Sequence, residues 1–213
     1  MTQYTPLHAP AFTDQDFDVF EVPGLEARME MLIANVRPKL TVLGDMIAPA
    51  LTLAAGEEMF PHVARHARRT VYPPDDTWVA WAANKRGYKM LPHFQVGLFS
   101  THLFAQFAII YESGNKTIFA KALASKTKDI IDMVPAGFVW SMDHTKPGAS
   151  PHERLTHDDF RGMAEKLSKT KNAEIMVGIH IARGDPLLSD GGKLFETFIR
   201  TFETLMPLYR MSF

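Results

Sequence analysis

Hydrophobic residues recur at helical spacing in several stretches of the chain. Residues 25–36 and 40–51 each carry one apolar stripe with Pro38 between them, so the pattern predicts two packing helices or one helix kinked at the proline. Residues 117–133 are mostly helical in pattern, and Thr156 with Asp159 forms a capping box for a helix through residue 169. The long apolar stripe over 193–209 predicts a helix that covers a sheet.

Alternating apolar and polar residues predict strands between these helices. The candidate strands are 77–84, 88–99, 102–112, 138–144 and 174–181. Lys85, Arg86 and Gly87 fit a hairpin turn between the first two strands. Residues 102–112 are apolar on both faces, which is typical of a central strand. Residues 17–22 fit a short extended piece, and residues 59–67 fit either a helix or a strand.

These elements predict an α+β fold in which a mostly antiparallel sheet is packed by helices. No repeat, low-complexity tract or shift in composition divides the chain, so we expect a single domain over residues 13–213. Residues 1–12 contain Pro6 and Pro10 and show no periodicity, which predicts a loosely ordered N-terminal arm.

The composition excludes several classes of protein. The chain has no cysteine, which rules out disulfides, thiolate nucleophiles and zinc sites built on sulfur. It shows neither a signal peptide nor a run of ~18 apolar residues, so we expect a cytoplasmic protein without membrane segments. A formal net charge of −1 disfavours nucleic acid as a general partner without closing that possibility.

Residues 62–93 concentrate the polar chemistry of the chain. Six cations against two aspartates leave this stretch a formal charge of +4, and since the whole chain carries −1, the remainder carries −5. Converging cations favour a phosphate or carboxylate counter-ion, and interleaved aromatic rings offer a flat ligand a surface. The alternative is a solvated basic face. The ligand-binding candidates are Arg65, Arg68, Arg69, Trp78, Asn84, Lys85, Arg86, Tyr88, Lys89 and His93.

The histidines and aspartates suggest acid–base chemistry more than a metal site. His62 and His66 have the spacing of a helical metal pair, but the glutamate of a zinc hydrolase is absent beside them. We therefore predict no metal and expect one or both imidazoles to hydrogen-bond to Asp75 or Asp76. A second cluster lies at residues 143–146, and His180 fits a core histidine. The catalytic candidates are His62, His66, Asp76, Asp143 and His144.

Five blocks of the sequence resemble a known family. The blocks are GEEMF (56–60), HARRTVYPPDDTWVAW (66–81), NKRGYKMLPHFQVGLF (84–99), SMDHTK (141–146) and FETLMPLY (202–209). They are similar to the YktB-like family of uncharacterised bacterial proteins, and the resemblance extends over residues 17–209. It implies a single domain of the bacterial cytoplasm with a sheet related in topology to the catalytic domain of biotin protein ligases. It implies no activity, because fold analogy does not carry function.

Two hypotheses about function follow from these residues. In the first, the protein binds a phosphate-bearing or other anionic small molecule in a pocket lined by His, Arg, Lys and Asp. In the second, it is a non-catalytic interaction module whose basic face meets an acidic protein or single-stranded nucleic acid. The residues are compatible with an enzyme and with a binding protein, and they identify no cofactor.

Overall fold

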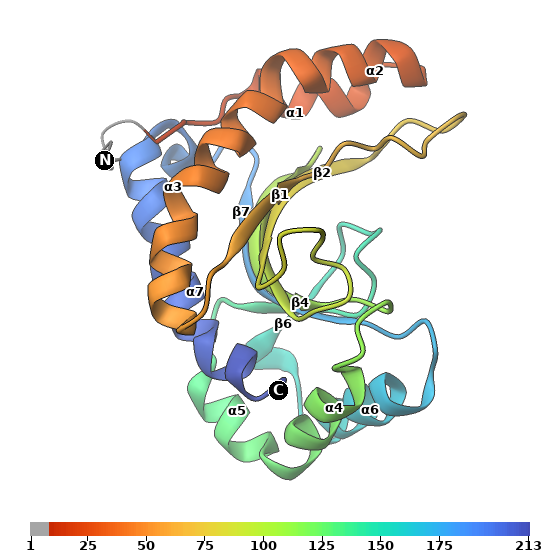
Figure 1. Cartoon of the computed structure of the whole chain (residues 1–213), viewed down its shortest axis with the longest axis vertical. Coiled ribbons are helices and arrows are strands. Elements are labelled where there is room, and N and C mark those ends of the chain that lie inside the picture. The colour runs from red at the N-terminus through yellow and green to blue at the C-terminus, as the bar shows by residue number, and fades with distance from the viewer. Residues whose placement is uncertain (1–8) are drawn as a thin grey trace.

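The helices and strands were assigned in a computed structural model that describes residues 9–213 (Figure 1). The helices are α1 (Asp14–Asp18), α2 (Leu25–Met31), α3 (Arg37–Ala55), α4 (Lys116–Ser125), α5 (Thr127–Met133), α6 (His157–Lys169) and α7 (Gly191–Arg210). The strands are β1 (Phe60–Val63), β2 (Asp76–Ala82), β3 (His93–Phe99), β4 (His102–Ile109), β5 (Val139–Ser141), β6 (Ser150–Pro151) and β7 (Ile175–Ala182). Short 3-10 turns occur at Val19–Glu21, His152–Arg154 and Pro186–Ser189.

The strands form one sheet in the order β1-β2-β3-β4-β7-β5-β6, and every pair in it is antiparallel. Because side chains alternate between the two faces of a strand, the register separates two sets of residues. Val79, Val96, Ala105 and Ile179 lie across one face, and Ala80, Gln95, Gln106 and Gly178 lie across the other. The predicted α+β domain with an antiparallel sheet packed by helices is confirmed.

Helices α3 and α7 cover the first of these faces (Figure 1). Trp81 is fully buried there, and its indole N–H donates to the carbonyl of Gly44 on α3 at 2.9 Å. A Cβ at Gly44 would lie 3.1 Å from the Cβ of Pro61, so α3 packs closely on the sheet at this position. Phe202 of α7 packs against Trp81 and Phe94, and burial of each such aromatic ring contributes about 1.5–3 kcal/mol.

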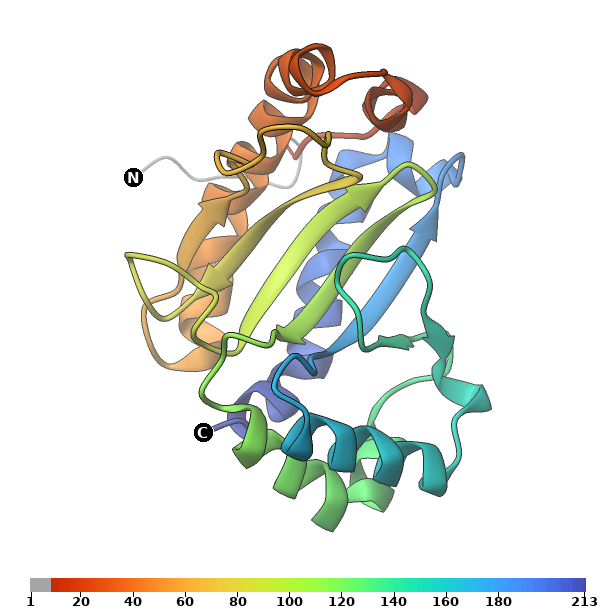
Figure 2. The same cartoon turned by 90° about the vertical axis from the view of Figure 1, so that its right-hand side faces the viewer.

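No described helix packs on the second face, which we call the open face. Figure 2 looks onto it, with α3 and α7 behind the sheet and α4 and α6 below it. Two connections lie on the viewer's side, the loop 83–92 between β2 and β3 and the loop 142–149 after β5. The residues of the open face come from alternate positions of β2, β3, β4 and β7, and many of them are polar.

Helices α4, α5 and α6 form a separate layer at one end of the sheet (Figures 1 and 2). Phe119 and Phe160 are fully buried in it, and Phe160 meets the ring of Trp140 edge-on at 5.1 Å. His152 accepts the indole N–H of Trp140 at 2.9 Å and lies 3.1 Å from the carbonyl of Ile131. This histidine is a structural bridge inside the core.

Three predicted elements differ from the observed ones. Residues 17–21 are helical rather than extended, because Thr13 and Asp16 form a capping box that starts α1. The return strand predicted from Tyr88 begins only at His93, and residues 83–92 form a long loop. Of the two alternatives at Pro38, two separate helices are not observed, because the helical run is continuous through this residue. A π-helical turn at Leu32–Val36 joins α2 to α3, and Pro38 occupies the first turn of α3, where its missing N–H costs nothing.

The predicted N-terminal arm falls largely on residues 1–8, which lie outside the described residues. Phe12 is buried, and its backbone N–H donates to the carbonyl of Leu188 at 2.8 Å. None of the helices found in residues 9–213 combines the length and apolar character needed to cross a bilayer.

Candidate functional site

A groove runs beside the free edge of the sheet, between α3, the edge strand β1 and the loop 83–92. It has a volume of about 660 Å³ and is lined by Arg37, Thr41, Asp45, Pro61, His62, Val63, Arg65, Lys85 and Arg86. Four of these side chains are cationic and only Asp45 is acidic. We call this feature the basic groove.

Hydrogen bonds to Asn84 fix one rim of the basic groove. Its backbone carbonyl accepts the Nε2–H of His62 at 2.8 Å, and its side-chain oxygen accepts the backbone N–H of Arg86 at 2.9 Å. On the other rim, the guanidinium of Arg37 donates to the carbonyl of Arg65 at 3.4 Å. These contacts attach the loop and the helix to β1, while Lys85 and Arg86 stay exposed.

Pro61 weakens the outer edge of β1 as a place for another strand. The N–H of Ala64 donates to the carbonyl of Trp78 on β2 at 2.8 Å. Since backbone groups of alternate residues point to opposite sides of a strand, the nitrogens of Pro61 and Val63 face outward. Proline has no N–H, so one of these two positions offers no donor to an added strand. The groove therefore suits a compact ligand better than an extended peptide.

The six predicted cations do not share one site. Arg65, Lys85 and Arg86 line the basic groove, whereas Arg69 donates to the carbonyls of Tyr72 and Pro73 at 3.3 and 3.1 Å. Lys89 lies on the open-face side, with its amine 3.6 Å from a carboxylate oxygen of Glu112. Arg68 is exposed on the loop between β1 and β2. The structure adds Arg37, whose position on α3 gave no sequence signal.

His62 and His66 do not form the expected pair. Strand β1 ends at Val63, and His66 has a left-handed φ of 52°, so the chain turns between the two imidazoles. Nε2 of His66 lies 3.2 Å from Oγ1 of Thr77, and its ring meets Trp78 edge-on. Burial and the nearby charges of Arg69 and Arg37 lower the pKa of His66 to about 4.

The expected hydrogen bond from these imidazoles to Asp75 or Asp76 is also absent in the described part of the chain. The backbone carbonyl of Asn84 is the partner of His62, and Thr77 is the partner of His66. Asp75 instead accepts from the buried guanidinium of Arg28 at 3.2 Å. Asp75 therefore pairs with Arg28 of α2 and with neither imidazole.

Tyr88 is the centre of the polar cluster on the open face. Its hydroxyl accepts the indole N–H of Trp78 at 2.9 Å. Its ring meets His93 edge-on with centroids 4.8 Å apart and lies 5.8 Å from the ring of His62. The loop 83–92 thus folds back over β3 and brings four predicted site residues together. His62 belongs to this cluster and to the lining of the basic groove.

A directed chain of hydrogen bonds crosses the open face below Tyr88. Nδ1 of His93 lies 2.8 Å from the carbonyl of Leu91, which can only accept, so Nδ1 carries the proton. Burial lowers the pKa of His93 to about 4. Nε2 of the neutral ring therefore accepts from the amide of Gln95 at 3.0 Å, and the oxygen of Gln95 accepts from Gln106 at 2.9 Å. The amide oxygen of half-buried Gln106 ends this chain.

Asp76 stands on the same face as Trp78, two residues before it on β2. Burial raises the pKa of this carboxyl to about 6, and the positive charges of His144 and Arg69 oppose the rise. A carboxyl with a pKa near 6 can exchange a proton at neutral pH. Asp76 is therefore the carboxyl among the predicted site residues whose pKa burial raises toward neutrality.

His144 is oriented by the buried Glu174 at the start of β7. The carboxylate accepts the backbone N–H of His144 at 3.1 Å and lies 2.8 Å from Nδ1. Hydrogen bonding to Glu174 raises the pKa of His144. Such a carboxylate–imidazole pair fixes the ring and leaves Nε2 for a ligand or a proton. Asp143 is instead half-buried beside it, bound to Thr145 and Lys146.

Two further histidines lie at one end of the open face. His102 and His180 stack with ring centroids 3.8 Å apart. Burial lowers the pKa of His102 to about 4 and that of His180 to about 3. His180 is half-buried on the open face and is not enclosed in the core, so its interpretation as a core histidine was wrong. In residues 9–213, no group of three or more His, Asp or Glu side chains is placed to hold a metal ion.

Sequence reasoning missed Gln95, Gln106 and Glu174. The alternation of His93, Gln95 and Gly97 with apolar residues already indicated a polar face on β3. No comparable signal marked Glu174, which lies 30 residues from its partner His144. Such a contact depends on tertiary pairing of strands.

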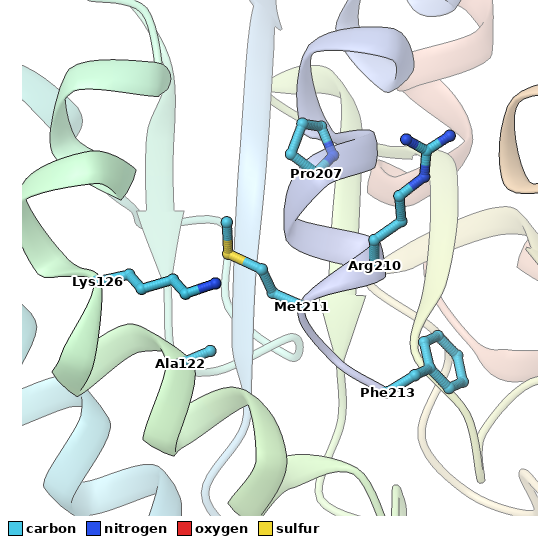
Figure 3. A pocket seen from close by; sticks show the side chains of 6 residues that line it. All are labelled: Ala122, Lys126, Pro207, Arg210, Met211 and Phe213. Carbon is cyan, nitrogen blue, oxygen red and sulfur yellow. The ribbon is translucent and has the colours of Figure 1, made fainter.

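A second hollow, of about 470 Å³, lies between α4 and the end of α7 (Figure 3). It is lined by Ala122, Lys126, Pro207, Arg210, Met211 and Phe213. Lys126 extends toward Met211, while the guanidinium of Arg210 extends away from it and donates to the carbonyl of Ala54. The hollow therefore presents one cation and an apolar wall, a weaker candidate than the basic groove.

The fold and its polar features define a single-domain α+β protein with a basic groove at one sheet edge and a polar open face. The chain belongs to the family described as "Domain of unknown function (DUF1054)", whose model matches residues 12–209. It is 47% identical over 201 residues to a UPF0637 protein of Bacillus velezensis, covering 94% of this chain and 96% of that protein. UPF0637 proteins of Bacillus mycoides and Bacillus licheniformis are each 46% identical and cover 94% of this chain and 96% and 95% of their own lengths. The resemblance to a bacterial family is confirmed.

Proposed function

We propose that this protein binds a phosphate-bearing or other anionic small molecule in the basic groove. The observation that carries the proposal is the convergence of Arg37, Arg65, Lys85 and Arg86 on one groove with a single carboxylate. Among the described residues, Arg65, Lys85 and Arg86 make no ion pair. Like charges gathered around one groove repel one another, and a bound anion relieves that repulsion.

The shape of the groove supports a compact anion over a peptide. Pro61 removes a backbone donor from the edge that an added strand would use. Arg37 and Arg65 lie on one rim and Lys85 and Arg86 on the other, which suits a ligand gripped from two sides. Arg offers a planar fork for phosphate or carboxylate oxygens, and Lys adds a point charge. An acidic protein bound at the same surface is the competing function.

Calorimetric titration with pyrophosphate tests this proposal. The wild-type protein is expected to bind it, and the double variant Lys85→Glu/Arg86→Glu is expected to lose at least about tenfold in affinity, equivalent to ~1.4 kcal/mol. Both side chains are exposed, so the thermal midpoint should change little. Failure of the wild-type protein to bind would contradict the proposal.

The second hollow provides a matched control. The variant Lys121→Glu/Lys126→Glu changes the net charge by the same amount at exposed positions of which Lys126 lines this hollow and neither lines the basic groove. It is expected to retain most of the affinity. An equal loss in both variants would indicate that overall charge, and not the basic groove, governs binding.

A further inference from the structure

The basic groove has two chemically different ends. At one end, the guanidinium of Arg37 reaches the backbone carbonyl of Arg65, which lies beyond the end of β1. At the other end, Asp45 follows Gly44, which packs beside Pro61 at the start of β1. Eight residues of α3 separate Arg37 from Asp45, which is a rise of about 12 Å along the helix axis. A phosphate bound at the first end therefore leaves the second end free to meet another chemical group.

The cations of the basic groove offer only hydrogen-bond donors. Arg37 and Arg65 supply them at one end, and Lys85 and Arg86 supply them from the opposite rim. Lysine and arginine side chains carry no acceptor, so they suit an anionic group with several acceptor oxygens, such as a phosphate.

Thr41 and Asp45 give the rest of the α3 wall the opposite character. The hydroxyl of Thr41 donates its proton to the carbonyl of Arg37 at 2.9 Å, so toward a ligand it can only accept. Asp45 is exposed and makes no ion pair within residues 9–213, although four cations line the same groove. Its carboxylate therefore remains an available acceptor beside Thr41, one helical turn away on the same face of α3.

Donors at one end and acceptors at the other favour a phosphorylated ligand that carries hydroxyl groups. The phosphate oxygens accept from the cations, and the hydroxyl groups donate to Thr41 and Asp45. An ammonium group would also pair with Asp45, but four cations and one carboxylate already give the groove a formal charge of +3. Hydroxyl groups use the same acceptors without adding a like charge to this set.

We propose that the basic groove binds a sugar phosphate, with the phosphate among the four cations and the sugar hydroxyls donating to Asp45 and Thr41. This inference rests on the proposed anion binding in the groove and specifies the class of ligand. Asp45 repels the phosphate itself. Its contribution to affinity therefore depends on the hydroxyl groups, and this dependence makes the inference testable.

Calorimetric titrations of the full chain with ribose 5-phosphate and methyl phosphate test the inference, because the two monoesters share the phosphate and differ in the hydroxyl groups. The wild-type protein is expected to bind ribose 5-phosphate at least about tenfold more tightly. Asp45→Ala should remove this preference by weakening ribose 5-phosphate binding. It should leave the affinities for methyl phosphate and pyrophosphate unchanged or higher, since it removes a repulsive charge. Because Asp45 is exposed, the fold should be little affected.

Asp132→Ala is the matched control. It removes the same charge at an exposed position of α5 that does not line the basic groove. This variant is expected to keep the wild-type preference for ribose 5-phosphate.

Equal affinities of the wild-type protein for ribose 5-phosphate and methyl phosphate would overturn the inference, as would a preference that survives in Asp45→Ala. Tighter binding of phosphoethanolamine than of ribose 5-phosphate would also overturn it, because Asp45 would then pair with an ammonium group. Pyrophosphate separates the two proposals. A protein that binds pyrophosphate without preferring ribose 5-phosphate to methyl phosphate loses only this inference, whereas one that binds none of these anions loses the proposed function as well.

Discussion

At the scale of single residues, His144 and Glu174 form the best-defined polar pair of the molecule. Glu174 is buried, and both of its carboxylate oxygens lie 2.8 Å from Nδ1 of His144. A charge-assisted hydrogen bond of this kind favours the protonated imidazole and holds its plane. The ring of Tyr111 stacks on it with centroids 6.4 Å apart. The imidazole is therefore fixed before any ligand arrives.

Replacing Glu174 with Gln is expected to lower the pKa of His144, since the hydrogen bond and charge of Glu174 raise it. A histidine whose pKa is higher in the folded protein than in the unfolded chain stabilises the fold at pH values below its unfolded pKa. This stabilisation is lost as the pH rises through the folded pKa. The variant should therefore lose more stability at about pH 6 than at about pH 9. Histidine resonances followed by NMR titration measure the pKa, with Glu165→Gln as the control. An unchanged pKa of His144 in Glu174→Gln would contradict this account.

At the scale of elements, the amphipathic patterns predicted most of the helices and strands. Phe94, Val96 and Leu98 pack under α3 and α7, while His93, Gln95 and Gly97 face the other way, and this difference in environment is the alternation visible in the sequence. The helix over 193–209 was predictable for the same reason, because one stripe of α7 is buried against the sheet.

The paths of the connections were not predictable in this way. Loop 83–92 returns over the open face through contacts of Tyr88 with Trp78 and His93, which no local pattern encodes. The basic groove depends on Arg37 meeting Arg65, which is 28 residues away. Clustered charge between residues 62 and 93 predicted that an anion site could exist, but tertiary packing decides which cations share it.

At the scale of the whole molecule, buried histidines make stability depend on pH. The pKa is lowered to about 4 for His66, His93 and His102 and to about 3 for His180, mainly by burial. Between the usual value of 6.5 and about 4, the unfolded chain binds more protons than the folded one, so stability falls as pH falls. The pKa of Asp76 is raised to about 6, so the folded chain binds this proton more readily than the unfolded chain. Its effect on stability is opposite to that of the histidines and offsets part of the loss.

We expect the free energy of unfolding in urea to fall between about pH 7 and pH 5, with His93 alone accounting for about 2 kcal/mol at about pH 5. This histidine is fully buried, so solvent does not screen its ionisation. The variant His93→Gln cannot titrate and should show a flatter profile. Stability that stays constant or rises over this interval would show that the buried histidines accept protons without cost.

Anion binding in the basic groove is the central functional claim, and locating a bound anion tests it most directly. Crystals soaked in tungstate should give an anomalous peak between the side chains of Arg65, Lys85 and Arg86, next to Arg37. The peak should be absent from crystals of Lys85→Glu/Arg86→Glu. Tungstate bound elsewhere, with the wild-type groove empty, would contradict the account.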